Sequence, residues 1–279
     1  MGVRDVLKER ILLFDGGTGT LLQEAGLAPG ELPEVWNVTH PEVLYGIHRA
    51  YLEAGCDVIL ANTFGANGLK YHPGAEYGLE TVVSAAMENA RRAVREAGRG
   101  YVALDIGPTG RLLKPMGDLE FERAVSLYQE VVKAGVQGGA DLILIETMGD
   151  LHELKAAVLA AKENSDLPVF ATVIFDAGGK LLTGGTPEAV VAMLEGLGVD
   201  ALGINCGLGP EQMRPLAERL VRCASVPVIV TPNAGLPRSE GKRTVYDVGP
   251  EEFAASMQAI LDFLCIFGSQ NNMLTPIMK

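Results

Sequence analysis

Gly55-Cys56-Asp57-Val58-Ile59-Leu60 is one of three similar stretches that decide the fold of this chain. Gly139-Ala140-Asp141-Leu142-Ile143-Leu144 and Gly198-Val199-Asp200-Ala201-Leu202-Gly203 follow the same pattern. In each, a helical segment ends at glycine, a short turn carries aspartate, and an apolar strand begins. Strands that are apolar throughout are typical of a parallel sheet covered by helices on both faces. The repeat therefore predicts helices that alternate with parallel strands.

Five further apolar runs have the length and composition of buried strands. They are residues 11–14, 101–104, 169–174, 228–231 and 264–267. Helical patterns separate them, with start signals such as Thr39-His40-Pro41-Glu42 and Thr186-Pro187-Glu188. Eight strands alternating with helices predict an α/β fold, the (β/α)8 or TIM barrel. We expect a single domain over residues 1–279, with its last helix missing or altered because few residues follow residue 267.

The composition limits which kinds of partner the protein can bind and in which cellular compartment it is expected. With 48% hydrophobic residues, the 279-residue chain can bury one large core. Its net charge of −12 argues against nucleic acid or an anionic membrane surface as a partner. No apolar run reaches the roughly 18 residues of a membrane span, and the charged amino-terminal segment lacks a signal-peptide core. The four cysteines are far apart in the sequence, so we expect free thiols or ligands in a cytoplasmic protein.

Polar residues follow the apolar strands at their carboxyl ends, where a barrel of this type builds its active site. They are Asp15, Asn62, Thr63, Asp105, Glu146, Thr147, Asn205, Cys206 and Asn233. Each alone could be a turn or helix-cap residue, but their recurrence at one face favours a functional site. The segment Asp15-Gly16-Gly17-Thr18-Gly19-Thr20 lacks the third glycine of a dinucleotide fingerprint. Its backbone N–H groups suit a small carboxylate and Asp15 suits an ammonium, which predicts an α-amino acid site.

Six motifs occur in an order that resembles the zinc-dependent homocysteine S-methyltransferase family. They are Asp15-Gly16-Gly17-Thr18-Gly19-Thr20, Asn62-Thr63-Phe64-Gly65, Asp105-Ile106-Gly107-Pro108-Thr109-Gly110, Glu146-Thr147, Gly203-Ile204-Asn205-Cys206 and Pro232-Asn233-Ala234-Gly235. The Gly207-Leu208-Gly209-Pro210 segment looks most like the homocysteine-binding module of cobalamin-dependent methionine synthase. The resemblance covers about residues 5–255.

The resemblance implies a role for each matching residue. Asp15 and Glu146 would hold the homocysteine ammonium, the turn of Gly16, Gly17, Thr18 and Gly19 would hold its carboxylate, and Asn62 and Asp105 would shape the pocket. Cys206 would be one of three zinc thiolates, and Asn233 is a candidate extra ligand when substrate is absent. Zinc binds a thiol sulfur and removes its proton at neutral pH, so no general base is required. We accordingly expect His40, His48, His72 and His152 to be structural or exposed.

The end of the chain departs from the family's pattern. The family carries its other two zinc ligands as a Cys-Cys pair in a Gly-Gly-Cys-Cys-Gly segment after the eighth strand. Alignment on Thr275-Pro276 puts Asn271 and Asn272 at the pair, whereas alignment on Ile266-Phe267-Gly268 puts Gln270 and Asn271 there. Cys56, Cys223 and Cys265 match no ligand position, and we expect them in the core or at helix ends. One thiolate with amide oxygens is a poor zinc site, so we expect weak or absent zinc and severely reduced methyl transfer.

Two explanations of the tail remain open: an altered terminus, through truncation, frameshift or engineering, or evolution away from zinc chemistry. The leading functional hypothesis is a homocysteine S-methyltransferase module that makes methionine, with methylcobalamin on a partner module as methyl donor. Folate- and cobalamin-binding modules or subunits are then the expected partners. The alternative is a metal-free barrel that binds an amino acid without methyltransferase activity. A phosphate-handling lyase or aldolase ranks lower, because no lysine stands at a strand end.

Overall fold

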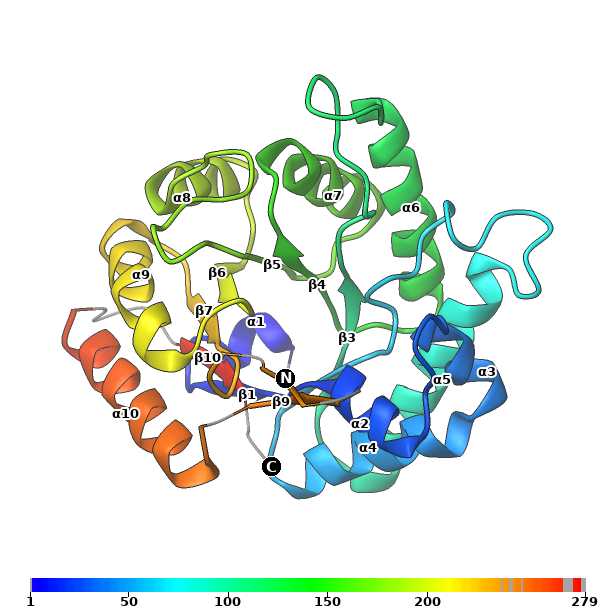
Figure 1. The fold of residues 1–279 in the computed structure, drawn as a ribbon, viewed down its shortest axis with the longest axis horizontal. Helices are drawn as coiled ribbons and strands as arrows, with labels where there is room; N and C mark the ends of the chain where they lie inside the picture. The colour runs from blue at the N-terminus through cyan, green and yellow to red at the C-terminus, as the bar shows by residue number, and fades with distance from the viewer. Residues whose placement is uncertain (1, 237, 241–242, 247, 268–272, 277–279) are drawn as a thin grey trace.

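The computed structural model describes residues 2–236, 238–240, 243–246, 248–267 and 273–276. Seven parallel strands, β1 to β7, curl around one axis, and β10 lies between β7 and β1 and closes the barrel (Figure 1). The barrel strands are β1 (Leu12–Phe14), β2 (Val58–Leu60), β3 (Tyr101–Ile106), β4 (Leu142–Met148), β5 (Val169–Val173), β6 (Ala201–Asn205), β7 (Val228–Thr231) and β10 (Met273–Pro276). A separate antiparallel pair is formed by β8 (Arg238–Glu240) and β9 (Arg243–Val245). The α/β barrel that the repeat predicts is confirmed.

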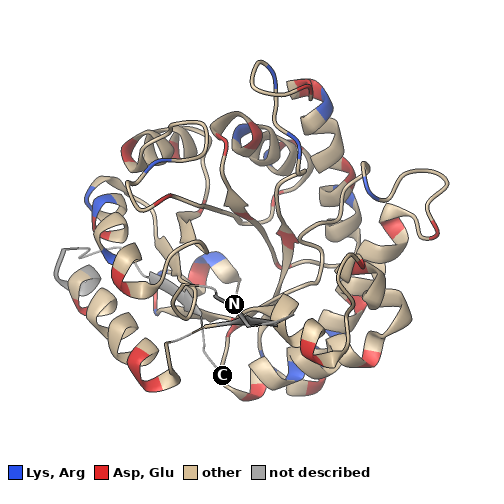
Figure 2. Cartoon of the chain, viewed as in Figure 1, with Lys and Arg blue, Asp and Glu red and all other residues tan. Residues whose placement is uncertain are grey.

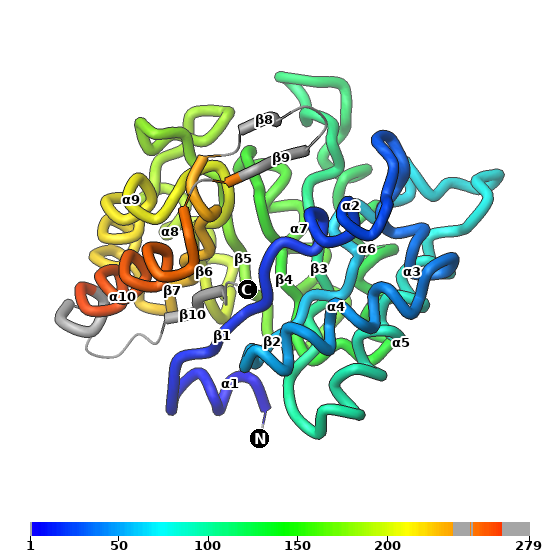
Figure 3. Tube along the Cα trace, turned by 60° about the horizontal axis from the view of Figure 1, so that its bottom comes forward, coloured from blue at the N-terminus to red at the C-terminus, as the bar shows by residue number. Residues whose placement is uncertain are grey.

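Helices cover the outside of the barrel, as the amphipathic patterns predict (Figure 1). They are α2 (Thr18–Ala25), α3 (Trp36–Thr39), α4 (Pro41–Glu53), α5 (Leu79–Ala97), α6 (Phe121–Gln137), α7 (Leu151–Asn164), α8 (Pro187–Gly196), α9 (Pro210–Cys223) and α10 (Pro250–Phe267), with a short 3-10 turn η1 (Pro33–Val35). One further helix, α1 (Val3–Val6), lies under the amino-terminal end of the barrel (Figure 3). Among the described residues, none of these helices combines the length and the hydropathy that crossing a membrane requires.

The predicted eighth strand at residues 264–267 is wrong. These residues end α10, and the eighth barrel strand is β10, which pairs in parallel with β1 and with β7. A run of four apolar residues carries no period that separates a strand from a buried helix, and here the run continues a helix that begins at Pro250. Residues 277–279, which follow β10, lie outside the described part of the chain. The missing or altered last helix therefore stays a prediction.

Strand side chains alternate between the barrel interior and the surface that the helices cover. Leu142 and Leu144 of β4 belong to an inner apolar cluster, while Ile143 and Ile145 belong to the outer core beneath the helices. Further along the strands, the inward positions become polar. Asp105, Glu146, Thr172, Asn205 and Thr231 all line one cavity at the carboxyl ends of β3 to β7. The interior is therefore apolar at the amino end and polar at the carboxyl end.

The aspartate of each repeat binds the backbone of the neighbouring strand. Asp57 accepts the N–H of Leu13 (3.0 Å), Asp141 that of Val102 (2.8 Å) and Asp200 that of Val169 (2.9 Å). Each carboxylate also pairs with an arginine: Arg10, Arg91 and Arg4 respectively. The Gly-x-Asp pattern thus encodes a clamp between adjacent strands at the end of the barrel opposite the polar cavity.

Asp57→Ala is expected to lower the free energy of unfolding by about 3 kcal/mol. Asp57 is buried, and its two carboxylate oxygens each accept a 2.8 Å hydrogen bond from Arg10, so its loss also leaves the Leu13 N–H without an acceptor. Asp141→Ala is the matched control, because that side chain is 31% exposed; its expected loss is about 1 kcal/mol. Denaturant unfolding measures both, and equal losses would contradict the importance of burial.

His48 is a buried histidine on α4, which agrees with the structural role expected from the sequence. Neither ring nitrogen has a hydrogen-bond partner among the described residues, and burial lowers its pKa to about 4. Between that value and about 6.5, the unfolded chain binds a proton that the folded chain does not. The folded state therefore loses stability as the pH falls through this range.

His48→Leu is expected to remove this one-proton dependence, because leucine cannot titrate. Unfolding free energies of the parent and the variant, measured at several pH values from about 4.5 to 6.5, give the difference in slope. The difference cancels the contributions of all other titrating groups. Parallel curves would show that His48 does not resist protonation in the folded chain.

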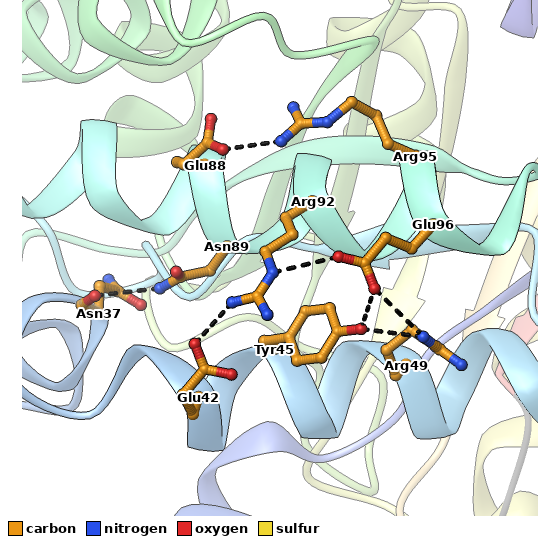
Figure 4. Close-up of polar contacts among 9 residues, drawn as sticks. All are labelled: Asn37, Glu42, Tyr45, Arg49, Glu88, Asn89, Arg92, Arg95 and Glu96. Carbon is orange, nitrogen blue, oxygen red and sulfur yellow. Dashed lines mark hydrogen bonds and ion pairs between the residues drawn. The ribbon is translucent and has the colours of Figure 1, made fainter.

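A polar network joins α4 and α5 on the outside of the barrel (Figure 4). The Arg92 guanidinium lies over the Tyr45 ring, 4.0 Å from its centre, and donates hydrogen bonds to Glu42 and Glu96. Beside it, Asn89 donates to the backbone oxygen of Asn37 (3.0 Å). Asn37 in turn donates to the backbone oxygen of Asn62 (2.8 Å), which lies just after β2. This buried amide chain fixes the end of β2 against α3 and α5.

Candidate functional site

A cavity of about 360 Å³ opens at the carboxyl ends of the barrel strands. The structure brings together there the described residues predicted to bind substrate or metal, which are Asp15, Gly16, Gly17, Thr18, Gly19, Asn62, Asp105, Glu146, Cys206 and Asn233. Thr63, which also follows a strand, does not line the cavity, and its hydroxyl donates to the backbone oxygen of Asp105. Gln270, Asn271 and Asn272, predicted at the Cys-Cys positions, lie outside the described residues. They precede β10 in the sequence, whereas the prediction assumed that they follow the eighth strand.

The cavity is strongly acidic. Four carboxylates line it, those of Asp15, Glu34, Asp105 and Glu146, and no lysine or arginine does among the described residues. The basic residues lie on the outer helices and loops instead (Figure 2). One oxygen of Asp15 and one of Asp105 are buried without a hydrogen-bond partner in the described structure. Such an arrangement is suited to a bound cation that supplies the missing partners.

Burial raises the pKa of each of three pocket carboxyls. For Asp15, burial raises the pKa well above its usual value and the neighbouring Glu146 adds to the effect, against a hydrogen bond from the Leu60 N–H (2.8 Å). For Asp105, burial is again the main cause, followed by repulsion from Glu146 and Asp15. The pKa of Glu146 rises to about 7 through burial. A cation in the cavity would favour the charged carboxylates and reverse these shifts.

The amino end of α2 forms another part of the cavity wall, directly after Asp15 in the sequence. Gly17 is the residue before the helix, and no side chain caps the first N–H groups of α2. Gly16, Gly17, Thr18 and Gly19 all line the cavity. Free N–H groups and the helix dipole together favour an anionic group at this position. The cavity therefore offers both an anion site and a cation site.

Asn62 shapes the pocket wall rather than pointing a free amide at the substrate. Its nitrogen donates to the backbone oxygen of Pro33 (2.8 Å) and to Oδ1 of Asn37 (3.1 Å). These bonds hold η1, which carries Glu34 into the cavity wall. Glu34 is fixed further by the Gly65 N–H (2.6 Å) and the Tyr71 hydroxyl (2.8 Å).

Cys206 stands directly after β6, between Glu146 of β4 and Asn233 after β7 on the cavity wall. Burial, and secondly the charge of Glu146, raise the pKa of its thiol to about 12. Cys56 is buried and Cys223 exposed, and neither lines the cavity. The side chain of Cys265 lies outside what the structure describes.

The donors present do not make a zinc site by themselves. In the described part of the chain, no three His, Cys, Asp or Glu side chains come together in a way that could hold a metal ion. Cys206 is accompanied by the amide of Asn233, which is a harder and neutral ligand. Catalytic zinc takes three strong protein ligands. The described residues therefore do not fit a catalytic zinc ion by themselves.

Several cavity residues were missed by sequence reasoning. Thr172 and Thr231 line the cavity at the ends of β5 and β7, and they share the inward parity of Phe170 and Ile229. Both residues can be identified from the sequence by taking every second position along each strand, because strand side chains alternate between two faces. Glu34 gave no such signal, because it comes from the long connection between β1 and β2.

Comparison with known proteins gives a consistent result. Residues 12–269 match the family model described as homocysteine S-methyltransferase. The chain is 37% identical to the methionine synthase of Mycobacterium tuberculosis and 35% identical to that of Mycobacterium leprae, in both cases over 95% of this chain. It spans only 23% of the length of these two relatives. The metallated form of the homocysteine methyltransferase MmuM of Escherichia coli has the same fold, with a TM-score of 0.77 at 22% identity over 99% of this chain and 95% of that chain.

Proposed function

We propose that this chain, which belongs to the homocysteine S-methyltransferase family, binds homocysteine in the acidic cavity as the acceptor of a methyl group. Methyl transfer to the homocysteine sulfur gives methionine. The observation that carries the proposal is the pairing of four carboxylates with an uncapped helix start across one cavity. An α-amino acid carries an ammonium and a carboxylate on one carbon atom, so it has a charged group for each of these two sites.

The two charged groups of homocysteine have distinct partners in this proposal. The ammonium lies against Asp15 and Glu146 and supplies the partner that the buried oxygen of Asp15 lacks. The carboxylate lies at the N–H groups that begin α2. In this proposal the side chain of homocysteine extends toward Cys206, which lines the same cavity.

The proposal extends to the role of zinc and to the identity of the methyl donor. In this family zinc supplies the deprotonation of the substrate thiol, which is otherwise mostly protonated at neutral pH. Because the described residues do not complete a zinc site, we propose that methyl transfer by this chain is strongly reduced. The proposed donor is methylcobalamin on a separate module, since the mycobacterial methionine synthases are about four times longer than the matched region. Folate- and cobalamin-binding modules are the proposed partners.

The incomplete donor set also favours a second candidate function. A barrel that keeps the acidic cavity but holds no metal would bind the amino acid without transferring a methyl group. Both candidate functions require homocysteine binding, but only the first includes transfer of a methyl group. Methyl transfer from methylcobalamin, assayed as methionine formed, separates them.

Calorimetric titration with homocysteine and 4-mercaptobutanoate tests the ligand. The second compound keeps the thiol and the carboxylate but lacks the ammonium. We expect homocysteine to bind about 100-fold more tightly, because the analogue leaves buried carboxylates without a partner. Equal affinities would refute the acidic wall as an ammonium site.

A further inference from the structure

We propose that Asn205 is a positioning residue that sets the places of Cys206, Thr147 and Glu146 in the cavity wall. Asn205 is the last residue of β6 and is 2% exposed. In the barrel, β6 lies between β5 and β7, and β4 follows on the other side of β5 (Figure 1). The inference rests on the proposed function in taking this cavity as the substrate site.

The Asn205 amide makes four polar contacts with three strand ends. Its Oδ1 accepts the Thr147 N–H (2.9 Å) and the Thr172 hydroxyl (2.9 Å). Its Nδ2 donates to Oγ1 of Thr147 (2.7 Å) and lies 3.5 Å from Sγ of Cys206. One buried side chain therefore fixes the end of β4 relative to β5 and to the thiol that follows β6.

The residues that Asn205 holds are conformationally strained. Thr147 has φ of 62° and Cys206 has φ of 55°, and no other non-glycine residue in the described structure has positive φ. This left-handed conformation is unfavourable for residues with a Cβ, above all for a β-branched threonine. Such strain persists only where surrounding contacts enforce it, and it gathers at functional sites. The same amide contacts both strained residues.

The strain has a structural origin in β4. The register between β4 and β5 shifts between Ile145 and Met148, which is the segment that contains Glu146 and Thr147. A bulge of this kind removes a backbone N–H from the strand ladder and re-aims a side chain. Asn205 accepts the N–H of Thr147 in place of the ladder. It thereby stabilises the bulge through which Thr147 lines the cavity beside the inward-facing Glu146.

Asn205→Leu removes all four contacts at similar side-chain volume, and Thr172→Val is the matched control. The control loses one contact but keeps those to Thr147 and Cys206. Two readouts are needed: homocysteine affinity by calorimetry, and the rate of iodoacetamide alkylation at Cys206 relative to the exposed Cys223 in the same chain. The alkylation ratio in folded protein reports the place of the thiol and does not require that homocysteine binds.

We expect Asn205→Leu to weaken homocysteine binding at least about tenfold and to raise the Cys206 to Cys223 alkylation ratio at least about threefold. Thr172→Val, which keeps the contacts of Asn205 with Thr147 and Cys206, should change the alkylation ratio by less than about twofold. An Asn205→Leu chain that folds and keeps both parental values would overturn the proposal. An equal effect of Thr172→Val on the alkylation ratio would do the same.

A second substitution keeps the test decisive if Asn205→Leu folds poorly. Thr147→Gly removes the Oγ1 partner and relieves the left-handed strain, so the effects of Asn205→Leu on folding and on the alkylation ratio should shrink at least about threefold in that background. Additive effects of the two substitutions would contradict a positioning role. If the parent chain binds no homocysteine, the proposed function fails, and the alkylation ratio still decides the role of Asn205.

Discussion

Asp15→Asn is expected to weaken homocysteine binding by about 100-fold and to raise the melting temperature of the unliganded chain. Asp15 is buried beside Glu146, and one of its oxygens has no partner in the described structure. The proposed ammonium supplies that partner, so removing the charge removes a buried ion pair. Without ligand, the same charge is unfavourable, because burial raises the pKa of Asp15.

The sign of the stability effect follows from the direction of the shift. A carboxyl whose folded pKa lies above its unfolded value stabilises the fold at low pH and loses that contribution as the pH rises through the folded value. At neutral pH, which lies above the usual pKa of an aspartate, the empty chain therefore carries a penalty that asparagine avoids, while the asparagine oxygen can still accept the Leu60 N–H. Loss of affinity with a gain of stability is a combination that simple misfolding does not produce.

Calorimetry and thermal unfolding of Asp15→Asn measure the two effects, and Asp141→Asn is the control. Asp141 clamps a strand at the opposite end of the barrel, so its substitution should lower stability and leave homocysteine affinity unchanged. If Asp15→Asn binds homocysteine as the parent does, the ammonium lies elsewhere. A lower melting temperature of the unliganded variant would contradict the argument from burial.

A Gly-Gly-Cys-Cys-Gly segment joined directly after Pro276 is expected to raise zinc affinity by at least about a thousandfold, since two added thiolates complete a three-thiolate set. Pro276 of β10 pairs with Phe14, the residue before Asp15, so a segment attached there starts at the level of the cavity. The engineered chain should also make methionine from homocysteine and methylcobalamin, because the metal supplies the missing thiol deprotonation.

The control for this design carries the same five residues at positions 268–272, ahead of β10. The amino end of β10 faces away from the cavity, so that variant should bind zinc no better than the parent. Zinc per chain after dialysis, measured by elemental analysis, distinguishes the three proteins. Tight zinc in the control and none in the extended chain would show that the assignment of the eighth strand is wrong.

The sequence predicted which residues line the cavity better than it predicted the last strand of the barrel. Glu146, Asp105 and Cys206 were found because each follows a buried apolar run, and parallel strands bring their carboxyl ends to one face. The family resemblance drawn from six motifs is confirmed by the match over residues 12–269. The strand predicted at residues 264–267 was wrong, because the apolar residues that end α10 have the same composition as a buried strand.

What the sequence could not predict depends on contacts between distant segments. Glu34 reaches the cavity only because Asn62 and Asn37 hold η1 against the end of β2. Asn205 stood in a predicted motif, but its importance comes from a bulge in β4 that no local pattern marks. Both features arise from packing between strands and connections, where local propensity carries no information.

The most direct test of the central claim is to measure homocysteine binding by the chain after a chelator has removed any metal. The claim is that the acidic cavity itself, through its carboxylates and the start of α2, holds the amino acid. We predict one homocysteine per chain, an affinity that added zinc leaves unchanged, and loss of binding in Asp15→Asn. Absence of binding in the metal-free chain, with tight binding restored by zinc, would contradict the account.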